Sequence, residues 1–426
     1  MLFKLRIFFH YLVTRYLRRF SSRSELERYQ ERRISRHLRW VKRHSKFYRE
    51  WSGGMIDKKI MMEHFTDLNT VGVDRDQAFD LAFRAEASRD FTPTLNGVTV
   101  GLSSGTSGNR GLFLVSDSER ARHAGTLLAK ILPGSILDQY RVAFFMRANS
   151  NLYTASSGSR ILFEFYDLLS PIEDHLERLE SQRPDLLFAP PSMLIRLAEA
   201  RAAGRIPAVP RRIFSIAETL DPLDERRMTA AFGMKVHQIY QCTEGFLAAS
   251  CEHGTLHLNE DCVRIDPEWL DETRTKFMPI ITDFTRTSQP VIRYRLNDIL
   301  TLRSTPCPCG SVMTALESIE GRSDDVLRFK RVSGGEPVAV FPDFIRRAVI
   351  TADEAIEEYL VTQARDGELD IHLKVMIGTE QGAVRNRIEV EISNLADRVG
   401  ALRPEIRFHE GIPSFAGKKL RRVLRL

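Results

Sequence analysis

The feature that most constrains the fold is a polar, glycine-rich stretch at residues 101–111, with the sequence Gly-Leu-Ser-Ser-Gly-Thr-Ser-Gly-Asn-Arg-Gly. Short runs rich in β-branched and apolar residues flank it at 98–100 and 112–115, and both favour strands. The stretch is therefore predicted to be a loop between two strands. Because glycines let backbone N–H groups approach an anion and hydroxyl groups add donors, such a loop suits a phosphate.

This loop is not a Walker A motif, which needs a Lys followed by Ser or Thr after its last glycine and opens a helix. Here Asn109 and Arg110 follow Gly108, and a strand is expected next. Taken alone, the stretch fits a polar hairpin turn equally well, since short motifs often match by chance. Motifs further along the chain favour the phosphate loop.

Charge is unevenly placed along the 426 residues, whose composition is ordinary for a globular protein of two or more domains. Residues 1–50 contain 15 Lys or Arg and 4 Asp or Glu, whereas the remainder contains 47 and 52. The net charge of +6 therefore belongs to the N-terminal arm and does not argue for nucleic-acid binding. Five cysteines and no secretory signal predict a reducing, cytoplasmic location.

Residues 1–19 mix apolar and aromatic side chains with five Lys or Arg. The uncharged run from Ile7 to Thr14 is too short for a bilayer span, which takes about 20 residues. One interpretation is a basic amphipathic helix that makes peripheral contact with the inner face of a membrane through residues 1–20. The favoured interpretation is a helix packed on its own domain with a solvated basic face. Residues 24–50 are expected to continue as one basic helix.

Strands and helices alternate from Ser116 onward. Ser116 and Glu119 offer a cap for a helix to about residue 132. Further strands are expected at 141–146, 185–189, 212–217 and 235–240, and further helices at 190–203 and 222–232. This alternation implies a parallel or mixed sheet, in which ligands bind beyond the carboxyl ends of strands. Two such ends carry Ala217-Glu218 and residues 240–244.

A polar break at Gly321–Asp325 follows a β-rich stretch over residues 254–303. Beyond it the pattern predicts a small α+β region, with strands near 326–330 and 336–341, a hairpin near 356–377 and helices near 342–350 and 380–400. The expected fold class is α/β, with a large N-terminal domain of mixed sheets and a small mobile C-terminal α+β domain. The expected domains are a helical arm at 1–50, a large domain at 51–321 and a small lid domain at 322–426.

Five segments stand in a fixed order along the chain, at 103–110, 240–244, 294–298, 321–325 and 417–418. Together they resemble the adenylate-forming superfamily of acyl-CoA synthetases, particularly its phenylacetate–CoA ligase and coenzyme F390 synthetase branch, over about residues 95–426. The resemblance implies that a carboxylic acid, aryl or otherwise hydrophobic, attacks the α-phosphate of ATP and releases pyrophosphate. A thiol, commonly that of coenzyme A, then takes the acyl group. Such chemistry depends on positioning and electrostatic stabilisation.

The resemblance also implies roles for the residues of the loop and of the basic tail. The β- and γ-phosphates would be cradled by Ser103, Ser104, Gly105, Thr106, Ser107 and Gly108. The family often has a Lys after the last glycine, so Arg110 would supply that charge here. Lys418 matches the family's catalytic lysine, with Lys419 as a rival and a solvated basic tail as the alternative interpretation.

Nucleotide contacts are implied at strand ends and at the polar break. Ala217 and Glu218 would form the adenine-side turn, and Tyr240 would stack on adenine. Thr243 would contact the α-phosphate, and Glu244 would help to hold Mg²⁺. Asp298 would bind the ribose hydroxyls, and Arg322 would contact ribose or phosphate. Asp324 matches the hinge about which the small domain rotates. The family's glycines at two of these places are Gln241 and Asn297 here.

Cysteines and a histidine provide a separate signal. Cys251, His257, Cys307 and Cys309 supply three thiols and an imidazole, a closed tetrahedral zinc set of a kind that the same branch often shows. The single residue between the last two cysteines is a tighter spacing than in zinc fingers. His253 is an alternative to His257, and free thiols are the alternative to zinc. The remaining Cys242 and Cys262 are interpreted as small buried residues.

Several functional alternatives stay open. The acyl group could go to an amine, a hydroxyl or a carrier-protein thiol, and no motif identifies the acid. The departures at Asn109, Gln241 and Asn297 also allow a non-catalytic nucleotide-binding relative. The basic arm allows a membrane-recruited enzyme of a lipid or envelope pathway. The expected partners are a small carboxylic acid and no nucleic acid, with a carrier protein and a second copy of the chain as further candidates.

Overall fold

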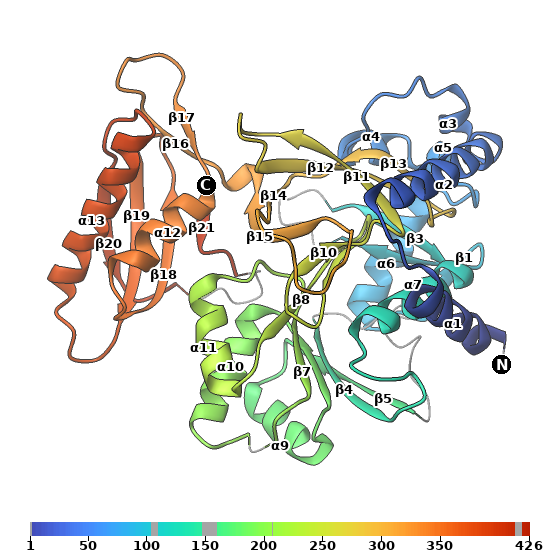
Figure 1. Cartoon of the computed structure of the whole chain (residues 1–426), viewed down its shortest axis with the longest axis horizontal. Helices are drawn as coiled ribbons and strands as arrows, with labels where there is room; N and C mark the ends of the chain where they lie inside the picture. The colour runs from blue at the N-terminus through green and yellow to red at the C-terminus, as the bar shows by residue number, and fades with distance from the viewer. Residues whose placement is uncertain (1, 104–109, 147–159, 207, 414–419) are drawn as a thin grey trace. The chain divides into compact units, whose positions relative to one another are not determined.

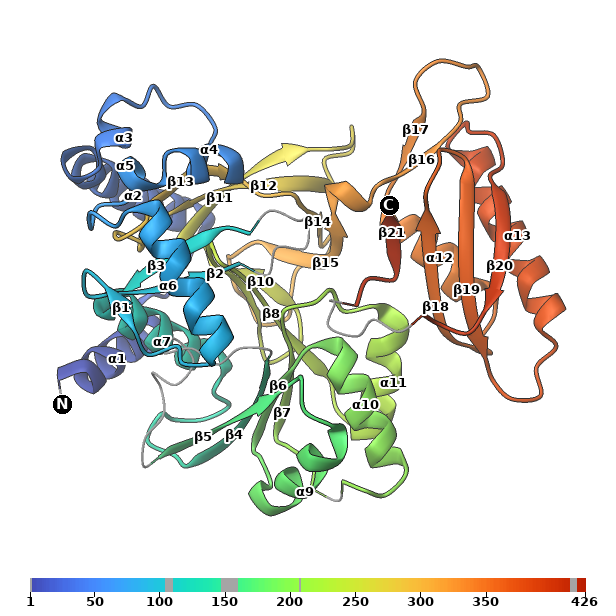
Figure 2. The ribbon, with the colours of Figure 1, turned by 180° about the vertical axis from the view of Figure 1, so that it is seen from behind.

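The computed structural model describes residues 2–103, 110–146, 160–206, 208–413 and 420–426 (Figures 1 and 2). The chain divides into two compact units. Unit 1 comprises Met1–Ala217, Arg227–Leu296 and Thr301–Ser318, and unit 2 comprises Glu218–Arg226, Asn297–Leu300 and Ile319–Leu426. The domain boundary expected at 321/322 stays a prediction, because unit 2 also takes in two segments from earlier in the chain.

The first helix, α1 (Leu2–Leu12), packs on α7 (Asp117–Ile131) through the buried side chains of Ile7 and Tyr11. Gly125 of α7 permits the close approach, since a Cβ added there would lie 2.4 Å from the carbonyl oxygen of Ile7. The expected packing of this segment on its own domain is thus confirmed for one face of α1. No helix among the described residues is long and apolar enough to cross a bilayer.

A second helical stretch follows a π-helical turn at Val13–Leu17. The single helix expected over 24–50 is wrong at Ser45, which separates α2 (Arg23–His44) from α3 (Lys46–Glu50). The backbone of Ser45 is extended, and its hydroxyl accepts a hydrogen bond from the N–H of Tyr48, so it caps a new helix. The next helices are α4 (Lys58–Glu63), α5 (Phe65–Leu68) and α6 (Arg75–Ser88).

The polar stretch joins two strands, as its flanking runs predict. An antiparallel three-stranded sheet contains β1 (Thr94–Leu95), β2 (Val98–Leu102) and β3 (Leu112–Ser116). Leu102 is opposite Leu112, and the N–H of Ser103 donates to the carbonyl of Gly111 at 2.7 Å. Ser116 and Glu119 then form the capping box of α7, as expected from the sequence.

A sheet of twelve strands forms the centre of the fold, in the order β11-β12-β14-β15-β10-β9-β8-β7-β6-β4-β5, with β13 paired to β12. Its parallel part and the helices between those strands are β4 (Tyr140–Met146), β5 (Ile161–Asp167), α9 (Ile172–Gln182), β6 (Leu186–Ala189), α10 (Pro191–Ala202), β7 (Arg212–Ser215), α11 (Pro222–Phe232) and β8 (Val236–Cys242). Its remaining strands are β9 (Gly245–Ser250), β10 (Leu256–Leu258), β11 (Val263–Trp269), β12 (Lys276–Asp283), β13 (Val291–Arg295), β14 (Asp298–Leu302) and β15 (Ala315–Arg322). The predicted mixed α/β architecture is confirmed.

Unit 2 has its own α+β core. A 3₁₀ turn at Ser323–Asp325 precedes the ribbon of β16 (Leu327–Phe329) and β17 (Val338–Val340). A four-stranded sheet has the order β20-β19-β18-β21, and α12 (Pro342–Ala352) and α13 (Gln381–Arg398) pack together on one of its faces (Figures 1 and 2). Its strands are β18 (Ile356–Gln363), β19 (Glu368–Val375), β20 (Glu405–Glu410) and β21 (Val423–Arg425).

The end of the chain differs from a solvated basic tail. Leu420 and Arg422 are buried, and β21 adds to β18 as a parallel edge strand. Arg422 donates to both carboxylate oxygens of Asp224, at 2.8 and 3.0 Å, and this pairing makes its burial tolerable. The solvated-tail interpretation is therefore wrong for residues 420–425.

Glu119 does more than cap α7. Its carboxylate accepts hydrogen bonds from the N–H and the hydroxyl of Ser288, at 2.9 and 2.6 Å, and so holds the turn before β13 against the helix. Burial by itself would raise the pKa of Glu119. The nearby charge of Arg286 and the hydrogen bonds from Ser288 and Ser116 outweigh burial, and the pKa lies below its ordinary value of 4.5.

We therefore expect the stabilisation by Glu119 to depend on pH. Because its folded-state pKa is depressed, the contribution is fully present above about pH 4.5 and is lost as the pH falls through the folded pKa. Glu119→Gln should lower the free energy of unfolding by about 1–3 kcal/mol at pH 7, and the gap from wild type should narrow by pH 3.5. Urea unfolding at three pH values measures this gap, with the exposed Glu27→Gln as control. A gap that does not change with pH would contradict the assignment.

Candidate functional site

Glu244 lies in the turn between β8 and β9, beyond the carboxyl end of a parallel strand. Its two oxygens are held separately. The hydroxyl of Thr243 donates to Oε2 at 2.8 Å, and the phenol of Tyr294 on β13 donates to Oε1 at 3.1 Å. Burial and the Glu244 charge raise the pKa of Tyr294, so its phenol stays a donor. The turn therefore presents an oriented, partly exposed carboxylate that could serve as a ligand of Mg²⁺.

Arg286 connects this turn to the hairpin that carries the glycine-rich stretch. Its guanidinium donates through Nη1 to the carbonyl of Thr243 and through Nη2 to the carbonyl of Leu114, the latter at 3.1 Å. Its charge also acts on two buried acids, Glu119 and Asp283. Burial raises the pKa of Asp283, although hydrogen bonds from Thr285 and the charge of Arg286 oppose that shift. One cation thus fixes β3 relative to the Thr243–Glu244 turn.

Ser103 is the described member of the predicted phosphate cradle, and Ser104, Gly105, Thr106, Ser107 and Gly108 lie outside the described residues. The N–H of Gly111 donates to Ser103 Oγ at 2.7 Å, and Lys58 Nζ donates to the same oxygen at 3.3 Å. The Lys58 side chain also lies 3.0 Å, at Cε, from where a Cβ on Gly111 would be. A lysine from the first turn of α4 therefore lies at the base of the glycine-rich stretch.

Local structure explains how Lys58 comes to this place. Ile56 pairs with β13, its N–H donating to the carbonyl of Arg293 at 3.0 Å and its carbonyl accepting from Arg295 at 2.8 Å. Asp57 then caps α4, since its side chain accepts from the N–H of Ile60 at 2.9 Å. The start of α4 is thus tied to the strand that carries Tyr294.

Arg110, predicted to supply the missing lysine's charge, is engaged elsewhere in this structure. Its guanidinium makes a bidentate pair with Glu86 of α6, with 2.7 Å between Nη1 and Oε2, and lies over the Phe83 ring at 5.9 Å. Its Nε donates to the carbonyl of Ser103 at 3.3 Å. Arg110 therefore stabilises the exit of the loop, whereas the Lys58 ammonium lies against Ser103 itself.

The predicted adenine-side residues lie at neighbouring strand ends. Tyr240 is buried on β8. Ala217 follows β7 with φ of 65°, a left-handed conformation that a residue with a Cβ adopts at a cost of about 1–2 kcal/mol. Glu218, the next residue, belongs to unit 2.

Unit 2 brings the predicted ribose and hinge residues together. Arg322 Nε lies 3.8 Å from Asp298 Oδ1, and the N–H of Ser323 donates to the carbonyl of Asn297 at 2.7 Å. The Asn297 amide donates to Asp324 at 3.0 Å, so the residue that replaces a glycine contacts the predicted hinge. Arg421 donates to the buried Asp325 at 2.8 Å. Lys418 and its rival Lys419 lie outside the described residues, but the chain after them is anchored to the same 3₁₀ turn.

The four predicted zinc ligands gather in one place. Their ligand atoms in Cys251, His257, Cys307 and Cys309 all lie within 4.8 Å of one another. The sulfurs of Cys251 and Cys307 are 3.6 Å apart, far beyond a disulfide bond of about 2.05 Å and near the separation of about 3.8 Å expected across tetrahedral zinc. Turns after β9 and before β15 supply the cysteines, and β10 supplies the histidine.

The histidine of this group is oriented for a metal. Nδ1 of His257 lies 3.1 Å from the carbonyl oxygen of Met313, so an Nδ1–H donates there and leaves Nε2 free to ligate. Nε2 lies 3.3 Å from the sulfur of Cys309. The structure brings His257, and not its alternative His253, into the group. These residues fit a structural zinc ion.

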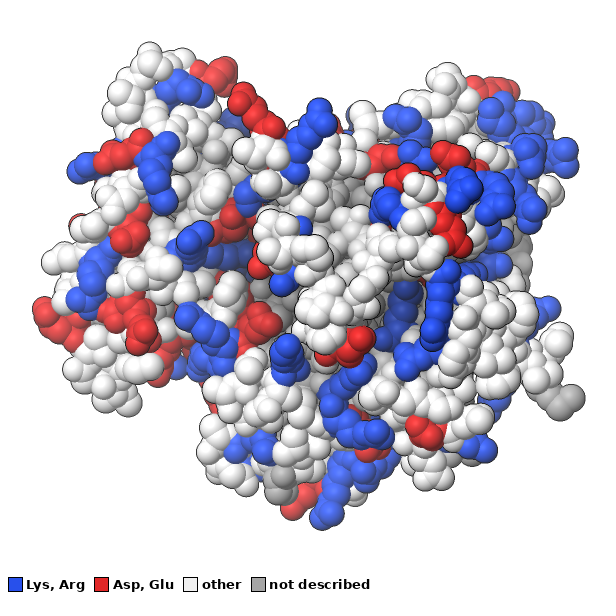
Figure 3. Space-filling model, viewed as in Figure 1, with Lys and Arg blue, Asp and Glu red and all other residues white. Residues whose placement is uncertain are grey.

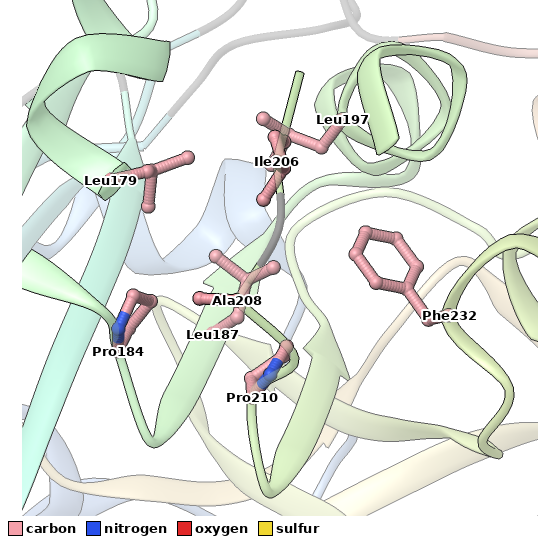
Figure 4. Close-up of a pocket in the computed structure, with 8 residues that line it drawn as sticks. All are labelled: Leu179, Pro184, Leu187, Leu197, Ile206, Ala208, Pro210 and Phe232. Atoms are coloured by element: carbon pink, nitrogen blue, oxygen red, sulfur yellow. The ribbon is translucent and has the colours of Figure 1, made fainter. Parts of the chain in front are cut away.

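A small recess elsewhere in unit 1 has a different character (Figure 4). It is lined by Leu179, Pro184, Leu187, Leu197, Ile206, Ala208, Pro210 and Phe232. Pro184 and Pro210 precede β6 and β7, so the recess lies at the amino ends of these parallel strands. None of these eight residues has a polar side chain. The recess lies at the amino ends of the strands, whereas Ala217 and Glu244 follow the carboxyl ends of β7 and β8. It is therefore not the candidate active site.

The chain is similar to known proteins in sequence and in fold. No protein-family model matches the chain. Two phenylacetate–coenzyme A ligases, from Thermus thermophilus and Aromatoleum evansii, are each 25% identical to it over 58% and 50% of its length. The matches span 62% and 50% of those relatives' own lengths, less than two thirds.

Solved structures show the same fold. A 2-hydroxyisobutyryl-CoA ligase in complex with 2-HIB-AMP superposes with a TM-score of 0.71 at 17% identity, over 96% of this chain and 91% of that one. The amide bond synthetase McbA from Marinactinospora thermotolerans has a TM-score of 0.57 at 14% identity, over 98% and 97%. The resemblance to the phenylacetate–CoA ligase branch and the adenylate-forming ligase fold are thus confirmed.

Two residues of the site, Lys58 and Arg286, were missed from the sequence, and Tyr294, which opens the predicted segment 294–298, was given no role of its own. Lys58 is 45 positions before Ser103, and no motif connects the two. Arg286 and Tyr294 lie in the segment Thr-Arg-Thr-Ser-Gln-Pro-Val-Ile-Arg-Tyr-Arg, whose arginines and tyrosine look like ordinary strand and turn residues. An alternation that placed Tyr294 on the inner face of its strand could have signalled that residue alone.

Arg286→Met should separate the Thr243–Glu244 turn from β3. The variant loses both carbonyl contacts and removes the cation that lowers the pKa of the buried Glu119 and Asp283, so we expect a loss of about 3 kcal/mol in the free energy of unfolding. The matched control is Arg264→Met, which removes an exposed pair with Asp266 and should cost less than about 1 kcal/mol. Urea unfolding measures both, and equal losses would contradict the bridging role.

Proposed function

We propose that this protein activates a carboxylic acid with ATP, releasing pyrophosphate and forming an acyl-adenylate. The thiol sulfur of coenzyme A then forms a bond to the acyl carbon, the bond from that carbon to the phosphate oxygen breaks, and AMP and the thiol proton are released. The observation that carries the proposal is the oriented Glu244 carboxylate, connected through Arg286 to the hairpin that bears the glycine-rich loop. The fold and the similarity to two phenylacetate–coenzyme A ligases support it.

In the first step, a carboxylate oxygen of the acid forms a bond to the α-phosphorus of ATP, and the bond from that phosphorus to the bridging oxygen of pyrophosphate breaks. The leaving pyrophosphate carries the negative charge that develops, so donors and cations near it accelerate the step. Mg²⁺ held by Glu244 would neutralise phosphate charge. Thr243 would contact the α-phosphate, and Tyr294 keeps the Glu244 carboxylate in place.

Two cations near the glycine-rich loop have different roles in this proposal. Lys58, which contacts Ser103, supplies the ammonium that the family usually places after the last glycine of the loop. Arg110, which is paired with Glu86, holds the loop's exit in place. A flexible lysine is a point charge suited to a β- or γ-phosphate, whereas the arginine fork is already satisfied by a carboxylate.

Unit 2 carries the ribose side of the proposal. Asp298 would accept hydrogen bonds from the ribose hydroxyls, with Arg322 beside it. By the same resemblance, Tyr240 and Ala217 of unit 1 and Glu218 of unit 2 would form the adenine side. Lys418 would contact both the carboxylate and the α-phosphate, and Asp324 would be the hinge of a lid over residues 322–426. The hydrogen bonds from Asn297 to Asp324 and from Arg421 to Asp325 support a defined conformation at that hinge.

The finer assignments rest on the same likeness. An aryl or hydrophobic acid is proposed because both relatives bear the name phenylacetate–coenzyme A ligase. The alternative acceptors of the acyl group are an amine, a hydroxyl and a carrier-protein thiol. A homodimer is the alternative to a single chain. We also propose that Cys251, His257, Cys307 and Cys309 hold a structural zinc ion, which would join the turns around β9, β10 and β15.

ATP–pyrophosphate exchange across aryl, fatty and amino acids is the test of the adenylation step. We expect exchange with one class of acid, and a fall of roughly 10²-fold or more in Lys58→Met and Lys418→Ala, because each loses a cation that stabilises phosphate charge. The control for Lys58 is Lys59→Met, since Lys59 is exposed and pairs with Glu63. Absence of exchange with every acid, although ATP and Mg²⁺ bind, would favour the non-catalytic alternative.

Product analysis then identifies the acceptor. With the active acid, coenzyme A should give a thioester, and amines or a carrier protein should not compete. An amide formed in place of the thioester would overturn the choice of coenzyme A without affecting the adenylation step. Equal exchange in Lys58→Met and in wild type would remove Lys58 from the phosphate site.

Metal analysis tests the zinc centre. Protein purified after metal-replete expression should contain about one zinc per chain, and Cys307→Ser and Cys309→Ser should abolish it. Chelation should lower the midpoint of urea unfolding, because the bound metal stabilises only the folded state. Cys262→Ala, which removes a buried thiol outside the group, should keep the metal. A stoichiometry near zero in the wild type would contradict the assignment.

A further inference from the structure

The outer face of α1 is apolar and exposed. Leu2, Leu5 and Phe9 follow one another at helical spacing on α1. Tyr16 and Leu17 are exposed in the π-helical turn that follows it. These five side chains are between 51% (Tyr16) and 74% (Leu17) exposed. The opposite face of α1 is the one that packs on α7 through Ile7 and Tyr11. The helix is thus held on the domain by one face and offers large apolar groups to the surroundings with the other.

Helix α2 carries a run of exposed arginines, which we call the arginine stripe. Arg28, Arg32, Arg36, Arg39 and Arg43 are spaced by three or four residues and so lie along one face. None of them makes an ion pair within the part of the chain that the structure describes. Glu27 pairs with Arg23, which leaves Glu31 as an acidic neighbour of the stripe. Lys42 extends the positive charge.

Both helices lie at the same edge of unit 1, as the two opposite views of the ribbon show (Figures 1 and 2). In the space-filling view, blue side chains gather at upper right over α2 (Figure 3). Lys4, Arg6 and Arg19 add exposed positive charge along and after α1, and they too make no ion pair with the described residues. Apolar and basic groups therefore share one edge, whereas the rest of the chain carries an excess of acid.

We propose that the outer face of α1 and the arginine stripe of α2 form a docking surface for an anionic lipid membrane. Exposed Leu, Phe and Tyr side chains suit insertion at the boundary between headgroups and acyl chains, and unpaired arginines suit the phosphate and carboxylate groups of anionic lipids. A nucleic acid would use the arginines but leaves the apolar face of α1 without a partner. This proposal goes beyond the ligase function and does not depend on it.

Rigid anchoring gives this surface a defined orientation. Arg15 donates to the carbonyl of Ala129 at 2.9 Å, and Tyr11 accepts from the N–H of Ile136 at 3.2 Å. Gln30 donates to the carbonyl of Glu260 at 2.8 Å and fixes α2 on the same unit. These contacts use other residues than the proposed docking face, so substitutions on that face leave the anchoring intact.

Sedimentation with vesicles tests the proposal on the full chain. We expect wild type to sediment with vesicles of phosphatidylcholine and phosphatidylserine, to lose this binding at high salt, and to stay in solution with phosphatidylcholine alone. Leu5→Glu/Phe9→Glu and Arg32→Gln/Arg36→Gln/Arg39→Gln should each lower the bound fraction roughly tenfold. All five side chains are exposed, so both variants should keep the wild-type circular dichroism.

Matched controls remove the same kinds of residue elsewhere. Leu169→Glu changes an equally exposed leucine outside the arm, and Arg205→Gln/Arg347→Gln/Arg398→Gln removes the same charge. Both should sediment like wild type. Controls that lose binding equally, or a wild type that does not sediment, would overturn the proposal.

Two other occupants would also overturn it. If wild type is a dimer that Leu5→Glu/Phe9→Glu dissociates, and neither sediments with vesicles, the face is an interface between copies of the chain. If RNA binds and phosphatidylserine vesicles do not, the stripe is a nucleic-acid surface.

Discussion

A single guanidinium connects the parts of unit 1 that carry the candidate chemistry. Arg286 donates to the carbonyl of Thr243, beside Glu244, and to the carbonyl of Leu114, in the hairpin of the glycine-rich loop. Its charge lowers the pKa of two buried acids, Glu119 and Asp283, and so opposes the effect of their burial. The position of the Glu244 carboxylate relative to the hairpin of the glycine-rich stretch thus depends on one planar donor that reaches two carbonyls at once.

A second buried network performs a comparable task in unit 2. Arg422 is paired with Asp224, and Tyr359 donates to Asp221 at 2.6 Å. The segment that follows the predicted catalytic lysine is therefore tied into the core of its unit by charge and by β21. Electrostatics in both units serve the same purpose, which is to place short polar segments between or after strands with a precision that apolar packing alone does not supply.

Local patterns were sufficient for much of the fold. Apolar runs on either side of the glycine-rich stretch identified β2 and β3, and Ser116 and Glu119 identified the start of α7. The helix expected at 190–203 corresponds to α10. Local patterns failed at Ser45, whose hydroxyl caps a new helix within a continuous basic pattern. They also failed in the basic tail, where pairing with β18 and the contact of Arg422 with Asp224 stabilise β21. Edge strands such as β20 depend on a partner far away in the chain, so their own residues carry little signal.

The chemical groups of the candidate site and their order along the chain follow from the amino-acid sequence alone. These are a polar loop between strands, the carboxylate Glu244 after a buried strand, Asp298 before a polar break, and three cysteines with a histidine. Which of these groups come into contact depends on how the chain packs. The tertiary structure places the Lys58 ammonium at the Ser103 hydroxyl, whereas Arg110 pairs with Glu86 and contacts the Ser103 carbonyl. It also places the Tyr294 phenol against Glu244, and it brings Cys251 and His257 together with Cys307 and Cys309. The reason is physical: strand pairing and helix caps act over a few residues, whereas the meeting of charges distant in the chain depends on the packing of the whole unit.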